Sequence, residues 1–216
     1  MKLKVRDPVN GFTHLIGALL SVAALVVLVY VAANKGTPWH IVSFAVFGAS
    51  LILLYTASTL YHLLPLSEKG TRELKRVDHM MIYVLIAGTY TPLCLVALRG
   101  VWGWSILGAI WGLAVLGVIM KIFWLNAPRW VSTLFYLVMG WLVVIAIPPM
   151  LHSVPLKGIF WLAAGGLLYT VGGIIYGMKK PNLFKGFGFH EIFHLFVIAG
   201  SMNHFWLMYR YILYVH

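Results

Sequence analysis

Acidic side chains are scarce in this sequence, which has only five Asp and Glu among 216 residues and 10% charged residues in all. An average soluble domain is about a quarter charged. With 62% hydrophobic residues, the chain has too little polar surface to cover a water-soluble globule. A single cysteine, Cys94, excludes an intrachain disulfide. No polar linker, low-complexity tract or internal repeat divides the chain, so we predict one membrane-embedded domain over residues 1–216.

The positive charge of the chain raises the question of a nucleic-acid partner. Sixteen Lys and Arg give a formal net charge of +11. They lie between apolar runs and form no basic stripe interleaved with exposed aromatic residues. We therefore predict no nucleic-acid partner and interpret these charges as signals of membrane topology.

Apolar segments of about 20 residues, the length that crosses a bilayer, recur along the whole chain. The first is longer than the apolar core of a signal peptide and has no clear cleavage site after it, so we interpret it as a spanning helix. The prediction is an all-α membrane protein, a bundle of seven transmembrane helices. The expected spans are 12–34, 40–64, 77–98, 102–124, 130–148, 157–178 and 187–209.

The distribution of basic residues over alternate loops predicts the orientation, because cytoplasmic loops retain positive charge. One side has four basic residues, Lys35, Arg99, Lys157 and Arg210. The other has twelve: Lys2, Lys4, Arg6, Lys69, Arg72, Lys75, Arg76, Lys121, Arg129, Lys179, Lys180 and Lys185. We expect a multi-pass protein of the inner (plasma) membrane, in contact with membrane lipids, with its N-terminus in the cytoplasm and its C-terminus outside.

Five of the nine histidines are predicted to lie at one level, near the cytoplasmic face. His14 opens the first span, His62 ends the second, His79 opens the third, and His190 and His194 open the seventh. Ionisable groups inside a membrane are costly to bury, so function is the first hypothesis for them. Isolated interfacial histidines that only hydrogen-bond loop carbonyls are the alternative.

The spacing of these residues favours a metal site. His190 and His194 are four residues apart, so their rings lie on one helix face and can share an ion. His62 can supply a third nitrogen, and three histidines leave the open position of catalytic zinc. Asp78 is then a fourth ligand or holds water at the metal, and Ser58, one turn from His62, can hydrogen-bond water or substrate.

Two further patterns allow more than one interpretation. Residues 190–194 match H-E-x-x-H, in which the Glu of zinc proteases is the general base; alternatively, Glu191 is favoured by the dipole of a helix N-terminus. The pairs Gly108–Gly112 and Gly173–Gly177 have GxxxG spacing. We interpret both pairs as packing sites between helices of this chain, with a dimerisation face as the alternative.

Five motifs carry a resemblance to a known family: Asn10-Gly11-x-Thr13-His14, Ser58-x3-His62, Asp78, Gly88-Thr89-Tyr90-Thr91-Pro92 and His190-x3-His194. At these residues the sequence resembles the hemolysin III family, the bacterial members of a superfamily with progestin and adiponectin receptors and alkaline ceramidases. The resemblance covers nearly the whole chain. It implies seven helices with the N-terminus inside, zinc held by His62, His190 and His194, and Asp78 and Ser58 beside it.

Three functions remain open at this point. The first is a zinc-dependent hydrolase of lipid amides or esters, in which zinc activates water and Asp78 accepts its proton. The second is a non-catalytic sensor or regulator of membrane state, in which the metal clamps helices together. The third, implied by the family name, is cytolysis. The lipid involved and the oligomeric state are left open.

Overall fold

The computed structural model describes residues 5–184 and 186–215, so Lys2, Lys4 and Lys185 of the charge pattern lie outside it. Within this part of the chain the structure is helical and has no strand. Its helices are α1 (Pro8–Lys35), α2 (Pro38–Leu63), α3 (Glu68–Pro92), α4 (Val101–Phe123), α5 (Arg129–Trp141), α6 (Ile147–Met150), α7 (Leu156–Met178) and α8 (Phe189–Arg210).

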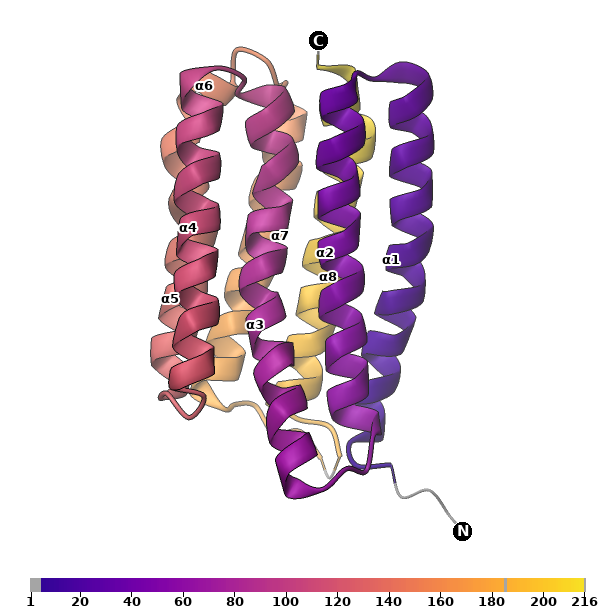
Figure 1. Ribbon diagram of the computed structural model, residues 1–216, viewed down its shortest axis with the longest axis vertical. Helices are drawn as coiled ribbons and strands as arrows, with labels where there is room; N and C mark the ends of the chain where they lie inside the picture. Colours follow the sequence, from indigo (N-terminus) through magenta and orange to yellow (C-terminus); the bar gives the residue numbers. More distant parts are fainter. Residues whose placement is uncertain (1–4, 185, 216) are drawn as a thin grey trace.

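The long helices form a closed ring. Each of α1 to α4 packs against the next helix, α5 packs against α7, α7 against α8, and α8 returns to α1. Figure 1 shows them running roughly parallel to one axis, with α1 beginning and α8 ending at opposite ends of the bundle. Neighbours in the chain are neighbours in space because every connection is short.

Six segments of the described chain are long and apolar enough to cross a membrane: α1, α2, Glu68–Ala97, α4, Arg129–Met150 and α7. They confirm six of the predicted spans. α8 has the length of a span, 22 residues, but is more polar than the other six. Its buried side chains include His194, Ser201 and His204, which face the bundle rather than its outer surface.

Two predicted spans are interrupted near prolines. Pro92 ends α3 and has no N–H for the helical hydrogen bond, and a π-helical segment, Leu93–Ala97, follows it. Pro148 and Pro149 have the same effect on the span expected at 130–148. It consists of α5, the 3₁₀ segment Leu142–Ala146 and α6. Helical structure continues after each interruption: Leu93–Ala97 extends α3, and residues 142–150 extend α5.

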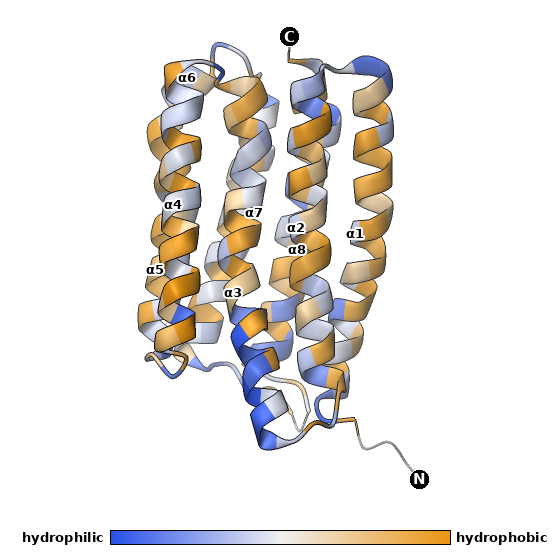
Figure 2. Ribbon diagram, in the orientation of Figure 1, coloured by the Kyte–Doolittle hydropathy of each residue, from blue (hydrophilic) through white to orange (hydrophobic). Residues whose placement is uncertain are grey.

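α3 begins nine residues earlier than the predicted span. Ser67 caps it by accepting a hydrogen bond from the Gly70 amide, and the first turns are charged, with Glu73 and Arg76 forming an ion pair. Figure 2 shows these hydrophilic turns extending beyond the other helices, at the end of the bundle where α1 begins. The helix therefore continues past the apolar segment that the sequence pattern detects.

Glycines allow the close packing of some helices, and the two GxxxG pairs differ. A Cβ on Gly173 or Gly177 would lie 3.6–3.7 Å from Thr133 of α5, so this pair packs within the chain as predicted. The prediction fails for Gly108 and Gly112, where nothing in the described structure lies within 4 Å of a Cβ. These two glycines face outward from α4.

A glycine-to-leucine pair tests the packing of the bundle. A Cβ on Gly88 of α3 would lie 2.7 Å from the Cβ of Ser50 on α2, whereas Gly112 has open space. We expect Gly88→Leu to destabilise the protein by about 1–3 kcal/mol through overpacking and Gly112→Leu to have little effect. Thermal unfolding of both variants in detergent measures this. Equal melting temperatures would contradict the packing of α2 on α3.

Candidate functional site

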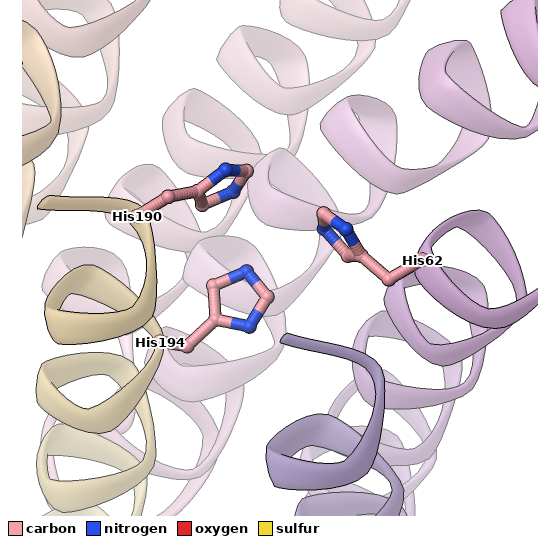
Figure 3. A group of neighbouring side chains, drawn as sticks. All are labelled: His62, His190 and His194. Atoms are coloured by element: carbon pink, nitrogen blue, oxygen red, sulfur yellow. The ribbon is translucent and has the colours of Figure 1, made fainter. Parts of the chain in front are cut away.

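Three histidines from two helices converge at the end of the bundle where α1 begins. His62 lies in the last turn of α2, and His190 and His194 lie in the first two turns of α8. Figure 3 shows their rings pointing toward one another. The ring centroids form a nearly equilateral triangle with sides of 4.9–5.1 Å.

The nitrogens of this group fit a metal ion. One ligand atom from each ring lies within 4.8 Å of the other two. Nε2 of His62 and Nδ1 of His194 are buried and have no hydrogen-bond partner in the described structure. Unsatisfied buried nitrogens are unfavourable, and three imidazoles are a preferred ligand set of zinc. The group could therefore hold a metal.

Asp7 orients His62 from outside the group. It stands before Pro8, where an aspartate usually caps the helix, but its side chain makes no capping hydrogen bond. Its Oδ2 instead lies 3.2 Å from His62 Nδ1 and 3.1 Å from Arg6 Nε, and its backbone amide donates to the His62 carbonyl. Burial raises the pKa of Asp7, but the hydrogen bonds from His62 and Arg6 outweigh it and hold that pKa below its ordinary value. The carboxylate therefore accepts the Nδ1 proton of His62, which leaves Nε2 free for a ligand.

Four of the five predicted site residues, all except His62, line a cavity of about 450 Å³. Ser58 and Asp78 are buried on its wall, together with His190 and His194. The Ser58 and Asp78 side chains are close to each other, although Ser58 Oγ has no hydrogen-bond partner of normal geometry among the described residues. Asp78 does not belong to the group of residues whose ligand atoms could share one ion. It lines the cavity together with His190 and His194.

His14 and His79 also lie near this region without joining the three histidines. His14 stacks on His194 with ring centroids 3.6 Å apart, and Tyr55 contacts its edge. Both its nitrogens are buried without partners in the described structure. His79 lines the cavity next to Asp78. Neither belongs to the group whose nitrogens could share one ion.

Glu191 has a structural role that does not fit a general base. One carboxylate oxygen accepts a hydrogen bond from Asn10 Nδ2 at 2.7 Å, and the other accepts one from the Gly188 amide at 2.8 Å. The residue thus caps α8 and ties it to α1. Its position agrees with the helix-terminus interpretation of Glu191, and the geometry does not support the zinc-protease interpretation.

Comparison with known proteins identifies the family. The family model described as "Haemolysin-III related" matches residues 3–205. The chain belongs to the haemolysin-III-related family. It is 45% identical to "Hemolysin-3 homolog" of Bacillus subtilis (strain 168) over 193 residues, which are 89% of this chain and 87% of that protein. It is 43% identical to "Hemolysin-3" of Bacillus cereus over 204 residues, 94% of this chain and 90% of that protein.

A human protein shows how far the similarity extends. "Monocyte to macrophage differentiation factor" of Homo sapiens is 26% identical over 207 residues, 94% of this chain and 83% of that protein. The resemblance inferred from the sequence motifs is therefore confirmed at the level of the family. With six apolar spans in the described structure, this member of the family is a multi-pass membrane protein.

Two residues at this end of the bundle are absent from the sequence-based list of site residues. Asp7 precedes the motif that opens α1, and its position before a proline indicates a helix cap rather than a partner of His62. Lys121 contributed only to the charge count, yet its side chain is buried and lines the cavity. No signal in the sequence places Asp7 beside His62 or Lys121 at the cavity, because both positions depend on contacts between segments that are distant in the sequence.

Removal of the Glu191 side chain tests its assigned role. Glu191→Ala leaves the Asn10 amide and the Gly188 N–H without their partner, so we expect a loss of roughly 1–3 kcal/mol of stability. Glu73→Ala, which removes only an exposed ion pair, is the control and should change stability by less than about 1 kcal/mol. Thermal unfolding in detergent reports both. An unchanged melting temperature for Glu191→Ala would contradict the capping role.

Proposed function

We propose that this protein is a resident enzyme of the plasma membrane that hydrolyses lipid amide or ester bonds with a zinc ion held by His62, His190 and His194. The observation that carries the proposal is the position of these histidines. They converge beside a largely apolar cavity that also contains Asp78 and Ser58. A volume of about 450 Å³ is within the range of ligand sites.

The topology belongs to the same proposal. We infer that α8 is a seventh span, because it closes the ring between α7 and α1 and its polar side chains face inward. We also infer that the N-terminal end is cytoplasmic. Arg6, Lys75 and Arg129 lie at this end, and positive charge is retained on the cytoplasmic side. The site then lies near the cytoplasmic face.

The cavity supplies the groups that hydrolysis requires. Bound zinc would polarise a carbonyl and make water more acidic. Asp78 can accept a proton from a water molecule in the cavity, and Ser58 can hydrogen-bond the substrate. Water adds to the carbonyl carbon, the bond to nitrogen or oxygen breaks, and the proton from Asp78 passes to the leaving group. The apolar walls exclude bulk water from this reaction.

Zinc content and turnover test the enzyme proposal together. We expect one zinc ion per purified chain and zinc-dependent hydrolysis of a lipid amide or ester, both abolished in His194→Ala. His152→Ala, which alters an exposed histidine away from the site, is the control and should retain both. Retained turnover in His194→Ala would refute the enzyme.

The alternative function, a sensor or regulator of membrane state, would use the same zinc site without hydrolysing a lipid. Its supporting observation is that the histidines come from α2 and α8, so a shared ion would clamp two helices together. Zinc removal would then lower the melting temperature, and no lipid would be hydrolysed. For cytolysis the support is the name of the Bacillus cereus relative.

The contact between Asp7 and His62 leads to a separate prediction. Without the carboxylate, the His62 ring loses the hydrogen bond that fixes its orientation, so Asp7→Ala should weaken zinc binding about 10- to 100-fold. Competition against a chelator of known affinity measures the change. Glu73→Ala is the control for the loss of a carboxylate at this end of the bundle. Equal zinc affinity in wild type and Asp7→Ala would contradict a role of Asp7 in zinc binding.

A further inference from the structure

Lys121 is a buried cation that forms no ion pair with a carboxylate in the part of the chain that the structure describes. It lies in the last turn of α4 with 1% of its surface exposed, and its Nζ donates a hydrogen bond to Ser132 Oγ at 2.6 Å. The ion pairs of the described structure are Arg6–Asp7, His62–Asp7 and Arg76–Glu73, and none involves Lys121. A lysine near a membrane interface normally extends its ammonium group to water. Lys121 does not, so its charge needs another explanation.

Other donors surround the same part of the cavity. Lys75 of α3 and Arg129 of α5 line it with Lys121, and no ion pair to a carboxylate neutralises either one in the described residues. The guanidinium of Arg129 lies 5.0 Å from the ring centre of Tyr176 and 5.4 Å from that of Phe189. Three cations from three helices therefore line one end of the cavity.

The first turn of α5 adds neutral donors. Ser132 and Thr133 lie in this turn and line the cavity. Thr133 Oγ1 is buried and has no hydrogen-bond partner in the described structure. The N-terminus of a helix also presents free N–H groups and a positive dipole end, which favour anions. Ammonium, guanidinium, hydroxyl and helix N-terminus together are the donors that bind phosphate.

Away from these donors and from the histidine site, the cavity is mostly apolar. Ile86 of α3, Val143 and Ile147 beyond α5, and Leu162 of α7 form its walls toward the far end of the bundle. Ile147 is eighteen residues from Arg129 in the continuous helical segment Arg129–Met150, or about 27 Å at 1.5 Å per residue. One end of the cavity thus suits an anion, and the remainder suits a hydrocarbon chain.

We propose that the cavity binds a single-chain lipid with a phosphate head group, held by Lys121, Arg129 and Lys75 with Ser132 and Thr133. The binding site stands on these residues alone. The further step, that such a lipid is the substrate, rests on the function proposed above. Arg129 contacts the ring of Phe189, the residue before His190, so the head group would lie close to the three histidines.

Binding to the purified full-length protein in a neutral detergent tests this site. The probes are oleoyl lysophosphatidic acid, the uncharged monoolein and inorganic phosphate. We expect the lysophosphatidic acid to bind at least about 10-fold more tightly than either of the others, because it alone matches both parts of the cavity. Comparable binding of monoolein would overturn the anion site, and comparable binding of inorganic phosphate would overturn the lipid.

Substitutions identify the residues responsible. Lys121→Met keeps the length of the side chain and removes its charge, so the preference for lysophosphatidic acid over monoolein should fall about 10-fold. Lys121→Arg should retain most of the preference, and Lys69→Met, an exposed lysine at the same end, should retain all of it. Arg129→Gln, at an exposed position, tests the same site if Lys121→Met does not fold. A preference unchanged in Lys121→Met and Arg129→Gln would refute the assignment.

The metal-site variant separates this inference from the proposed enzyme. His194→Ala should retain the lipid preference while losing zinc and turnover. A preference for the phosphate head group without any hydrolysis supports the binding site and refutes the enzyme. Hydrolysis of neutral lipids without that preference supports the enzyme and refutes the binding site.

Discussion

The hydrogen-bonding demand of buried polar groups, which lipid cannot meet, governs the structure of this protein. In a bilayer a polar side chain must find its partner inside the bundle or remain unsatisfied at considerable cost. Deep inside the ring one such group meets this demand: Ser201 Oγ lies 2.7 Å from the hydroxyl of Tyr55 and 2.9 Å from that of Tyr169, which joins α2, α7 and α8. At the histidines it is not met within the described chain. Groups that remain unsatisfied where others are satisfied indicate a place for a ligand.

The same demand explains which parts of the fold could be predicted from sequence. Six spans were predictable because each contains a stretch of mostly apolar residues that is as long as a bilayer is thick, whether it faces lipid or, like much of Glu68–Ala97, the interior of the bundle. The early start of α3 was not, since its first turns are charged and lie beyond the apolar segment. The outward position of Gly108 and Gly112 was also not predictable, because GxxxG spacing describes one helix surface and not its neighbour.

The site was predictable to the extent that it depends on positions within single helices. The spacing of His190 and His194 follows from helix geometry, and His62 matches their depth because it ends its own span. Asp7 and Lys121 could not be assigned in this way. Asp7 reaches His62 because the residues before α1 pass over the end of α2, and Lys121 faces the cavity because α4 packs between α3 and α5. Such contacts depend on how the helices pack together and not on the sequence of any single helix.

Glu191 illustrates why a sequence motif must be interpreted together with its position in the helix. In a zinc protease the Glu of H-E-x-x-H is within reach of the metal site as a general base. Here the string begins at the N-terminus of α8, where free amide groups attract the carboxylate, and Asn10 of α1 takes its second oxygen. Both carboxylate oxygens of Glu191 therefore already accept a hydrogen bond from the protein. Asp78 lies on the cavity wall and outside the three-histidine group, and in the function proposed above it is the residue that accepts the proton.

The cations and the histidines at this end of the bundle would together orient a ligand. The cations of α3, α4 and α5 line the same cavity as His190, His194 and Asp78. An amphiphile has one polar end, and the cavity toward the far end of the bundle is mostly apolar, so its chain would extend in that direction. The bond nearest its head group would then face Asp78 and the histidines. A cavity with this polarity would determine which bond of a lipid is presented as well as which lipid is bound.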